Sequence, residues 1–460
     1  MTGIRDWYFR SLDGIRMELW MEKVKTAFTG LFVLGLMLCL GGCALDSSFL
    51  ENLGGSAEAV QESEPLQMQE SAPEHDTPPL KNGKKKKQGN SEKAETVENE
   101  ENNQDAEDGQ ASEIVPEETL EPVADIYYAY FKLDTVSKKL YHEILSALTN
   151  LEESITISTL DKSLIDKVFY SVMNDHPELF YVEGYQYTEY SINQKITSIT
   201  FQGTYSMTAT EAAATREQID KQLADCFREV PLNEDEYNTV KYLYDYLIHN
   251  TEYDKNAANN QNICSVFLQG RSVCQGYAKA LQYMLQNVGM QALVVTGFTN
   301  GERHAWNLVR VNGAYYYIDP TWGGASYSYC GDLSEGSYTP PINYDYFLVT
   351  TDELTRTHSI EMVVPLPDCV SVDDNYFVRE GLYYTAYNKE MLTLIFESES
   401  TKAADYVILK CSTPEVYNEF MQKLISDQEI FDFIDNQGGT IAYTSNQNQR
   451  TISFWNFCGV

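Results

Sequence analysis

Apolar side chains recur at three- and four-residue steps in the stretch that follows Cys274. The residues at these steps are Tyr277, Leu281, Met284, Leu285 and Val288. This spacing places them on one face of a helix, and Gly289 is the kind of residue that ends one. Ser272 and Gln275 fit a capping box at its start. The pattern therefore predicts a helix that holds Cys274 in its first turn and stops at Gly289.

A two-residue turn is the strongest local signal further along the chain. Asn312-Gly313 separates two apolar and aromatic runs, 304–311 and 314–319. This dipeptide between such runs is typical of a β-hairpin. With two residues in the turn, Val311 lies opposite Ala314, and the rest of the register follows from that pair.

The hairpin register decides which side chains share a face of the sheet. It places Trp306 opposite Asp319, and His304 lies two residues from Trp306 on the same face. His304 and Asp319 are then diagonal neighbours with Cα atoms about 7 Å apart, within reach of an imidazole and a carboxylate. A slip of one residue would move Asp319 to the other face. We expect Trp306 and Trp322 to act as packing walls.

Segments on both sides of this region alternate between helical and strand patterns, so we expect an α+β fold. Helical spacing is found in 124–148, 160–174, 208–227 and 233–250. Strand patterns are found in 180–190, 196–205 and 292–298. Thr208 and Glu211 form a second capping box. Pro177 forbids continuation of the second helix, which makes His176 a helix-end residue rather than a ligand.

The pattern changes again from about residue 365 and predicts a small α+β accessory domain over 363–460. Strand patterns cover 377–387, 392–397, 406–410, 440–445 and 450–455, and the last two form a closing hairpin. A helix is expected over 414–426, beginning at Thr413. No group of residues here suggests a second active site, so we interpret this domain as a binding or packing module.

The first 43 residues have the parts of a secretory signal. Lys23 and Lys25 precede an apolar run, 27–40, that is short for a bilayer span of about 20 residues. Leu40-Gly41-Gly42-Cys43 resembles the bacterial lipobox, in which Cys43 takes a lipid after cleavage and anchors the protein outside the cytoplasm. An uncleaved transmembrane anchor is the alternative. Residues 44–122 are polar and nearly free of aromatics, so we expect a disordered acidic tether.

Charge and cysteine content narrow the functional classes. A net charge of −35 argues against nucleic acid or anionic lipid as a partner of the protein surface. Apart from Cys39 in the signal, Cys43 and Cys274, the cysteines are Cys226, Cys264, Cys330, Cys369, Cys411 and Cys458. They could pair in an exported chain. Their scatter, without CxxC or Cys/His clusters, argues against a metal site, and no cofactor is expected.

Cys274, His304 and Asp319 are the candidate catalytic residues. In the first turn of a helix, unpaired N–H groups and the positive end of the dipole favour a thiolate. The hairpin would supply a base and a carboxylate that orients it. Each residue alone has a simpler interpretation, since a lone Cys is often a small buried apolar residue and a lone strand His is often structural. The agreement of helix start and hairpin register favours the triad.

The sequence around these residues resembles the transglutaminase-like superfamily, relatives of papain-type cysteine peptidases. Residues 273–278 (VCQGYA), 304–307 (HAWN) and 319–322 (DPTW) carry the resemblance, which extends over about 253–348. It implies a core in which the nucleophile helix packs on an antiparallel sheet. The resemblance places that catalytic domain at 231–362, after an N-terminal α+β region at 123–230.

The resemblance also implies a role for each candidate. Cys274 would be the nucleophile, His304 the general base and acid, and Asp319 the residue that fixes the imidazole tautomer. The oxyanion hole would need the Cys274 N–H and a second donor, for which Gln269 and Gln275 are candidates by proximity alone. His358 is a poor rival to His304, because nothing in the sequence places it near Cys274.

Two functional classes follow from these residues. The first is an enzyme in which Cys274 forms a thioester with a peptide or protein substrate at the cell surface, resolved by water or by an amine. Hydrolysis is slightly favoured, because water needs no second binding pocket. The second is a surface lipoprotein that uses the same fold to hold a peptide or protein without catalysis.

Overall fold

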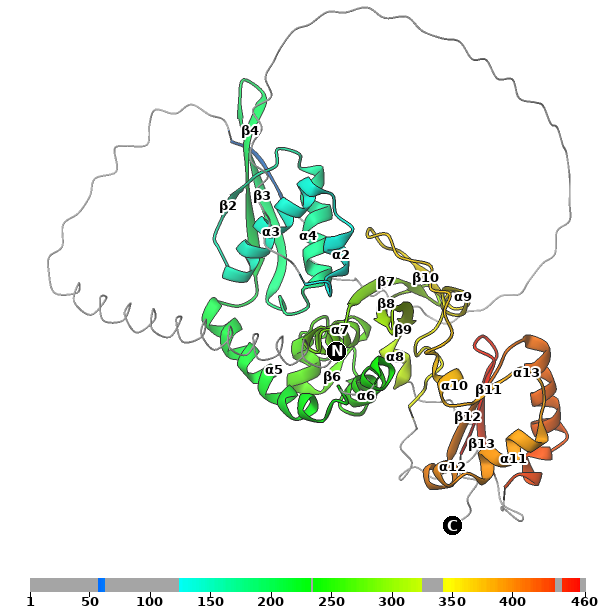
Figure 1. Ribbon diagram of the computed structural model, residues 1–460. Coiled ribbons are helices and arrows are strands. Elements are labelled where there is room, and N and C mark those ends of the chain that lie inside the picture. The colour runs from blue at the N-terminus through cyan, green and yellow to red at the C-terminus, as the bar shows by residue number, and fades with distance from the viewer. Residues whose placement is uncertain (1–56, 63–123, 233–234, 325–341, 435–440, 456–460) are drawn as a thin grey trace, which may run out of the picture. The chain divides into compact units, whose positions relative to one another are not determined.

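The computed structural model describes residues 57–62, 124–232, 235–324, 342–434 and 441–455 (Figure 1). The chain divides into two compact units, 1–55 and 56–460, and every described residue lies in the second. The predicted signal, the lipidated Cys43, most of the 44–122 tether, Cys330 and Cys458 lie outside the described residues. The domain limits expected at 230 and 362 stay a prediction.

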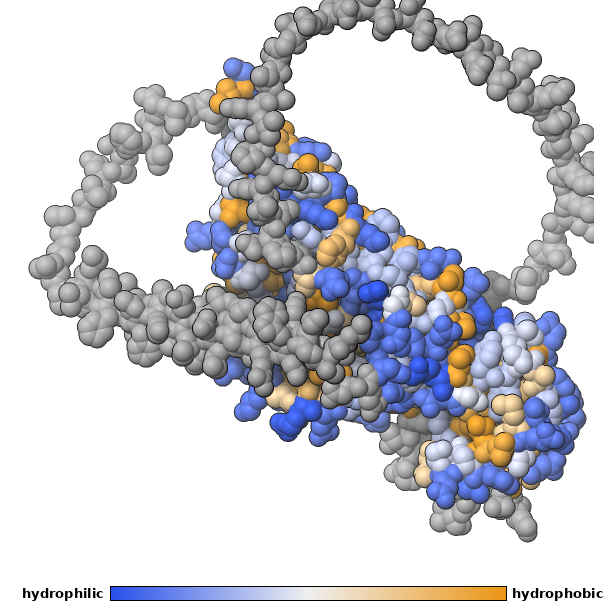
Figure 2. Space-filling model, in the orientation of Figure 1, coloured by the Kyte–Doolittle hydropathy of each residue, from blue (hydrophilic) through white to orange (hydrophobic). Residues whose placement is uncertain are grey.

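The described residues form helices and several β-sheets, three of them with four strands. This mixture confirms the α+β class. The three larger sheets have the strand orders β1-β3-β4-β2, β10-β7-β8-β9 and β11-β12-β14-β13. None of the helices within the described ranges is both long and apolar enough to cross a membrane. On the face that Figure 2 shows, the surface is mostly hydrophilic, with apolar residues scattered over it.

The N-terminal region contains one sheet, with helices before and after its main strands in the sequence. Its elements are α2 (Tyr128–Phe131), α3 (Thr135–Asn150), β2 (Ile155–Ile157), α4 (Ser163–Asp175), β3 (Val182–Ile192), β4 (Lys195–Tyr205) and α5 (Ala209–Glu229). The β3–β4 turn is Asn193-Gln194, both with positive φ, as a two-residue hairpin turn requires. The capping box of Thr208 and Glu211 is present at the start of α5. His176 ends α4 as predicted.

One strand lies where the sequence predicts a tether without structure. β1 (Ala57–Glu62) pairs antiparallel with β3, from Ala57 opposite Tyr190 to Glu62 opposite Gln186. The prediction was wrong for this segment, because it considered only side-chain burial. An open sheet edge offers backbone N–H and C=O groups to any extended segment, whatever its composition.

The central sheet carries the candidate site. Its elements are α6 (Glu236–His249), β5 (Glu252–Tyr253), η1 (Ser265–Gln269), β6 (Arg271–Ser272), α7 (Cys274–Asn287), β7 (Ala292–Thr299), β8 (Glu302–Val311), β9 (Ala314–Ile318), α8 (Pro320–Gly323), α9 (Thr351–Leu354) and β10 (His358–Ile360). Apolar residues of α7, β7 and β8 meet in a small buried cluster with Cys274: Ala278, Val294 and Ala305. The nucleophile helix therefore packs on the antiparallel sheet.

The β8–β9 hairpin has the predicted register. Val311 pairs with Ala314 and Asn307 pairs with Ile318, around a turn in which Asn312 and Gly313 both have positive φ. The amide of Asn307 donates to the backbone oxygen of Ala278, 2.9 Å away, and so ties this strand to α7. These contacts fix the position of the hairpin relative to the helix.

The C-terminal sheet departs from the prediction in its first half. Its elements are α10 (Tyr376–Arg379), β11 (Tyr383–Tyr384), α11 (Lys389–Glu397), α12 (Glu399–Ala404), β12 (Tyr406–Cys411), α13 (Pro414–Phe420), η2 (Met421–Ser426), η3 (Glu429–Asp432), β13 (Ala442–Asn446) and β14 (Thr451–Trp455). The closing hairpin and the Thr413 cap are confirmed. The predicted strand 392–397 is wrong, since it lies in α11.

Two local features explain why α11 is a helix. Asn388 caps it by accepting a hydrogen bond from the backbone N–H of Met391. Leu392 and Phe396, four residues apart, are its buried side chains. The predicted strand 377–387 is likewise wrong, since its residues are divided between α10 and the two residues of β11.

Buried polar contacts join the central and C-terminal sheets. The Lys410 ammonium lies 2.9 Å from a Glu353 carboxylate oxygen, and Lys410 is buried. The Thr451 hydroxyl donates to Asp345, 2.7 Å away, and the Gln449 amide donates to the backbone oxygen of Glu353, 3.0 Å away. We call these five residues the polar seam.

Candidate active site

Cys274 is the first residue of α7, as predicted, and it is 7% exposed. The predicted capping box is wrong, because the N-cap is Val273 and no side chain caps the helix. The Ser272 hydroxyl instead donates to the backbone oxygen of Asn260, 2.9 Å away. Ser272 lies one residue before the N-cap, and a Cβ on Gly276 in the first turn would lie 1.9 Å from its oxygen. The hydroxyl therefore serves the preceding loop rather than the helix.

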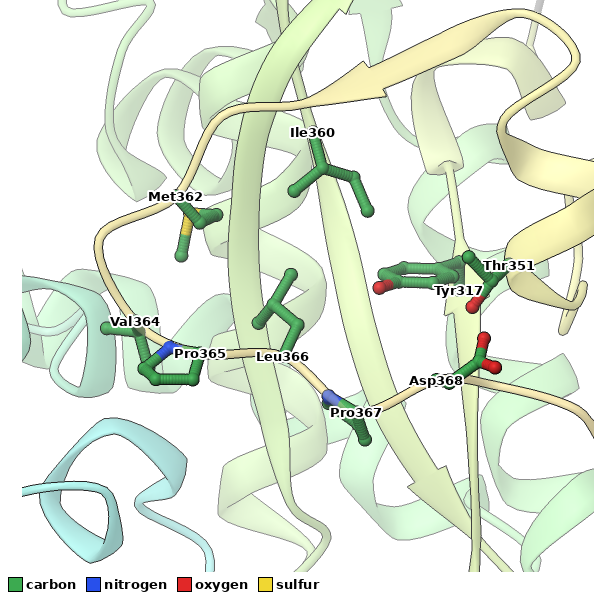
Figure 3. A pocket seen from close by; sticks show the side chains of 9 residues that line it. All are labelled: Tyr317, Thr351, Ile360, Met362, Val364, Pro365, Leu366, Pro367 and Asp368. Atoms are coloured by element: carbon green, nitrogen blue, oxygen red, sulfur yellow. The ribbon is translucent and has the colours of Figure 1, made fainter. Parts of the chain in front are cut away.

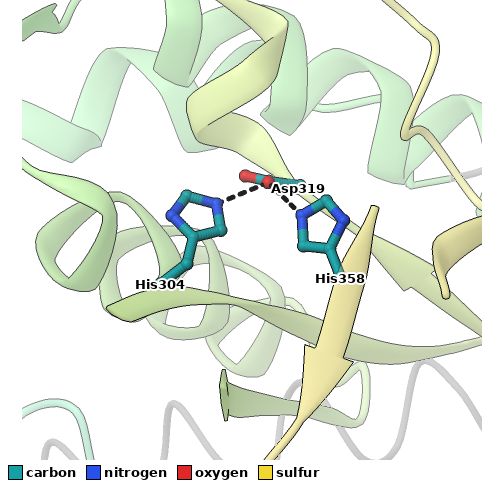
Figure 4. A group of neighbouring side chains, drawn as sticks. All are labelled: His304, Asp319 and His358. Atoms are coloured by element: carbon teal, nitrogen blue, oxygen red, sulfur yellow. Dashed lines mark hydrogen bonds and ion pairs between the residues drawn. The ribbon is translucent and has the colours of Figure 1, made fainter. Parts of the chain in front are cut away.

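His304 and Asp319 meet as the hairpin register predicts. The Nε2–H of His304 donates to Oδ2 of Asp319, 2.7 Å away, and both residues are buried (Figure 4). The other oxygen of Asp319 accepts from the backbone N–H groups of Thr321 and Trp322, at 2.9 and 3.4 Å. Asp319 is thus also the N-cap of α8, which holds its carboxylate in one orientation.

The Cys274 sulfur completes the arrangement, because it lies near enough to the His304 ring to raise the pKa of that ring. Because Nε2 of His304 is bonded to Asp319, the sulfur side is left to Nδ1. The structure thus brings together all three residues that the sequence singled out.

The charges of this group favour a protonated imidazole. Burial opposes protonation of His304, but the Asp319 carboxylate and the Cys274 sulfur outweigh it and raise the pKa of His304 to about 10. Burial would also raise the pKa of Asp319, but the charge and hydrogen bond of His304, helped by His358, hold it well below its usual range. At neutral pH the His304 imidazole is therefore protonated.

His358 lies in this site, which the sequence did not predict. Its Nε2 is 3.2 Å from the same Asp319 oxygen that His304 contacts, and its side chain is fully buried (Figure 4). It comes from β10, which pairs with the edge of β7, so that His358 lies opposite Thr299. A three-residue strand with no turn linking it to β7 leaves no local signal, so the sequence could not reveal this position.

Aromatic rings surround the two histidines. Trp306 and Trp322 lie 4.9 and 5.1 Å from the His358 ring, measured between centroids. Trp306 is fully buried and packs in the apolar cluster on the outer face of the sheet with Leu308 and Tyr317, which agrees with its expected role as a wall. Such packing excludes water from the His304 and Asp319 pair and strengthens their interaction.

Neither candidate for the second oxyanion donor is supported by a contact to the site. The Gln269 amide donates to the backbone oxygen of Ala258, 3.1 Å away, and Gln269 is exposed. The buried side-chain oxygen of Gln275 has no hydrogen-bond partner among the described residues. Proximity in sequence did not identify the donor, because the Gln269 side chain bonds to a neighbouring loop and the Gln275 oxygen is buried without a partner among the described residues.

His304, Asp319 and His358 are also residue types that bind metal ions. Their ligand atoms lie within 4.8 Å of one another. The distances of 2.7 and 3.2 Å from the two ring nitrogens to one carboxylate oxygen are hydrogen bonds. They leave each nitrogen directed at the oxygen rather than at a shared point about 2.0 Å from all three, as zinc requires. The group is therefore built for hydrogen bonding.

A cavity of about 380 Å³ lies next to Tyr317 of β9 (Figure 3). Its lining is mainly apolar and consists of Tyr317, Thr351, Ile360, Met362, Val364, Pro365, Leu366, Pro367 and Asp368. Cys274, His304 and Asp319 are not among these residues. The cavity therefore adds no substrate pocket to the site.

Comparison with known proteins identifies the central region. Residues 226–320 match the family model of the Transglutaminase-like superfamily. Kyphoscoliosis peptidase from Mus musculus is 24% identical over 176 residues, and that from Homo sapiens is 23% identical over 176 residues. Each match covers 34% of this chain and 25% of the relative, so this chain spans about a quarter of the length of these relatives.

A solved structure described as the crystal structure of a TGase is also similar. It is 18% identical, with a TM-score of 0.24 over 31% of this chain and 46% of that chain. The family match includes α7, β8 and the start of α8, and hence Cys274, His304 and Asp319. The chain therefore contains a transglutaminase-like superfamily domain and is homologous to kyphoscoliosis peptidase.

Proposed function

We propose that this chain is a cysteine-dependent enzyme that acts on amide bonds of peptides or proteins. The proposal is carried by one observation: Cys274 is clustered with Ala305, the neighbour of His304, and His304 in turn donates to the Asp319 carboxylate, 2.7 Å away. A nucleophile, a base within hydrogen-bond reach and a group that orients the base are the parts that covalent acyl transfer needs. The position of the sulfur at the N-terminus of α7 adds the favourable end of a helix dipole.

Each proton in the reaction has a place to go. The Cys274 thiolate attacks the carbonyl carbon of the substrate, and the His304 imidazolium gives its proton to the departing amine as the C–N bond breaks. The thioester that results is attacked by water or a primary amine, whose proton returns to the neutral imidazole as the C–S bond breaks. Asp319 holds the ring so that one nitrogen faces the sulfur throughout.

Hydrolysis is the favoured outcome of the second step. Transfer to an amine needs a binding place for that amine beside the thioester, whereas water needs none. None of the residues that line the 380 Å³ cavity belongs to the Cys274, His304 and Asp319 group. Peptidase or amidase activity is therefore proposed ahead of cross-linking.

A non-catalytic role is the second candidate. Cys274, His304 and Asp319 are 7%, 5% and 0% exposed, so a substrate must find a nearly covered sulfur. A protein that uses this fold only to hold a peptide would show such burial without need of a reactive thiol. The location proposed with either function is the outer cell surface, with a lipid on Cys43 as the anchor.

A labelling assay separates hydrolysis from amine transfer. The soluble part of the protein, from residue 44 onward, is incubated with casein and a fluorescent primary amine. Fragments without label indicate a hydrolase, and covalent label on intact casein indicates a transferase. Cys274→Ala is the control and removes both signals. Equal signals from the wild-type protein and the Cys274→Ala variant would contradict the enzyme proposal.

Reactivity of the thiol tests the non-catalytic alternative directly. Burial raises the pKa of Cys264 to about 11, so this thiol is an internal reference within the same molecule. With iodoacetamide at pH 7, Cys274 should be alkylated at least about tenfold faster than Cys264, because the thiolate is the reacting species. Peptide mass spectrometry measures both rates at once. Equal rates would favour the binding protein.

A further inference from the structure

A single carboxylate oxygen accepts from two histidines in this site. Oδ2 of Asp319 is 2.7 Å from Nε2 of His304 and 3.2 Å from Nε2 of His358. Oδ1 of Asp319 is occupied by the backbone N–H groups that begin α8. The Asp319 carboxylate is therefore held by His304, by His358 and by the backbone of α8. Of these donors, His304 is the one beside the Cys274 sulfur.

The tautomer of His358 is set by its neighbours. The Thr357 hydroxyl oxygen lies 2.9 Å from Nδ1 of His358, and the Tyr346 hydroxyl oxygen lies 2.8 Å from the Thr357 oxygen. When Tyr346 donates to Thr357 and Thr357 donates to Nδ1, the proton of the neutral His358 ring is on Nε2. That proton points at Asp319. The three side chains form a relay that presents one N–H donor to the carboxylate.

Backbone packing holds the ring in place. β10 approaches β7 so closely that a Cβ on Gly297 would lie 1.9 Å from the backbone oxygen of Ser359 and 2.8 Å from the Trp306 ring. Gly297 also pairs with His304 across β7 and β8. The same glycine therefore lies beside both histidines, and it allows His358 to reach Asp319.

We propose that His358 is a positioning residue of this site, an inference that rests on the proposed function. Its Nε2–H keeps the Asp319 carboxylate turned toward His304, and so keeps the opposite nitrogen of His304 toward the Cys274 sulfur. His358 has a fully buried side chain, and its ring nitrogens bond to Asp319 and Thr357. It acts only through Asp319, and its contribution is to preorganise the pair that does the chemistry.

The test compares a variant that lacks the donor with one that keeps it. His358→Leu removes the N–H, whereas His358→Gln places an amide N–H at a similar reach. The second-order rate of Cys274 alkylation by iodoacetamide at pH 7 is measured for both, with His304→Ala as reference. We expect His358→Leu to be slower by about tenfold, the effect of losing a hydrogen bond to a charged group, and His358→Gln to be within about twofold of wild type.

A second pair of variants removes any dependence on folding of the His358 variants. Thr357→Val removes the hydroxyl that fixes the tautomer, and Thr357→Ser keeps it. Slower alkylation in Thr357→Val alone supports the relay. Wild-type rates in both His358→Leu and Thr357→Val overturn the proposal, as does a folded His358→Gln variant that is as slow as His358→Leu.

The same measurements separate this proposal from the proposed function. If the wild-type protein and His304→Ala react at equal rates, the proposed function fails, whatever the His358 variants do. If His304→Ala is slow while the His358 and Thr357 variants match wild type, the enzyme proposal stands and the positioning role fails. Circular dichroism of each variant confirms that the compared proteins are folded.

Discussion

Two aspartates in different sheets are equally buried but carry opposite electrostatic consequences. Asp175, at the end of α4, accepts from the backbone N–H groups of Ala129 and Tyr130 and from the Tyr141 hydroxyl. Asp319 accepts from two backbone N–H groups and two imidazoles. Both are completely inaccessible to solvent. The difference between the two sites is therefore the kind of donor and not the degree of burial.

The donors decide in which direction the pKa of each carboxylate moves. Burial raises the pKa of Asp175 to about 6, since its mostly neutral donors offset only part of the cost of losing water. At Asp319 burial acts in the same direction, but the charge of His304 reverses the result and lowers the pKa. A buried carboxylate serves an imidazole well when the imidazole itself stabilises the charge.

The largest expected effect is a loss of turnover when Asp319, but not Asp175, is replaced by asparagine. Asp319→Asn removes the charge that orients and stabilises His304, and turnover of casein should fall by about 10³- to 10⁴-fold, as for the orienting residue of other triads. Asp175→Asn should leave turnover within about twofold, because its contacts lie in the α2 and α4 region. Comparable losses in both variants would erase the distinction.

The stability that Asp175 contributes should fall as pH rises through the acid range. In the folded state Asp175 keeps its proton up to about pH 6, whereas the unfolded chain releases it near 3.8. The folded state binds more protons in this window, so the stability from Asp175 falls as pH rises through it. Relative to Asp175→Asn, wild type should lose roughly 3 kcal/mol of unfolding free energy between pH 4 and 7. Urea titrations at several pH values measure this.

His304 should make the stability depend on pH in the same direction as Asp175, but in the alkaline range. Its pKa is raised from 6.5 to about 10, so the stability that it contributes is fully present below pH 6.5 and is lost as pH rises toward 10. The difference in unfolding free energy between wild type and His304→Ala should therefore shrink over this alkaline range. A difference that grows with pH would contradict the assigned charges.

A smaller loss of unfolding free energy is expected when Gly297, which lies on β7 next to β10, is replaced by alanine. Gly297→Ala forces β10 away from β7, since its Cβ would lie 1.9 Å from the Ser359 oxygen. Overpacking of this kind costs about 1–3 kcal/mol, and Cys274 alkylation should slow because His358 moves with β10. Gly324→Ala is the matched control, since its Cβ would meet only Ile248 at 3.5 Å. Equal unfolding free energies for the two variants would refute the close approach.

The smallest effect concerns one neutral donor of Asp175. Tyr141→Phe removes a 3.1 Å hydrogen bond and should cost about 1 kcal/mol of unfolding free energy. Thermal or urea unfolding measures the loss, and turnover should stay unchanged. A change in turnover would link the N-terminal sheet to the site and weaken the contrast between the two aspartates.

Local signals in the sequence account for the parts of the site that could be predicted. Asn312-Gly313 specifies a turn by itself, and the turn sets the register that brings His304 to Asp319. The apolar spacing after Cys274 likewise determines which residue begins α7. Both depend on neighbours within a few residues, which is the range over which a single sequence is informative.

Contacts between distant segments account for the parts that could not be predicted. His358 reaches Asp319 because β10 joins the edge of β7 after a long connection. Ser272 does not cap α7 because it lies one residue before the N-cap and donates to the backbone oxygen of Asn260 instead. α11 was taken for a strand because a short apolar run has no clear period until its cap at Asn388 is recognised.

The polar seam has a consequence for how this protein can change over evolutionary time. Asp345 finds its partner in Thr451, 106 residues along the chain, and Glu353 finds its partner in the buried Lys410 of β12. Gene truncation or recombination that removed the last sheet would strand two carboxylates and expose the segment that leads to His358. Exchange of the C-terminal part for an unrelated module would therefore require new partners for both acids at once.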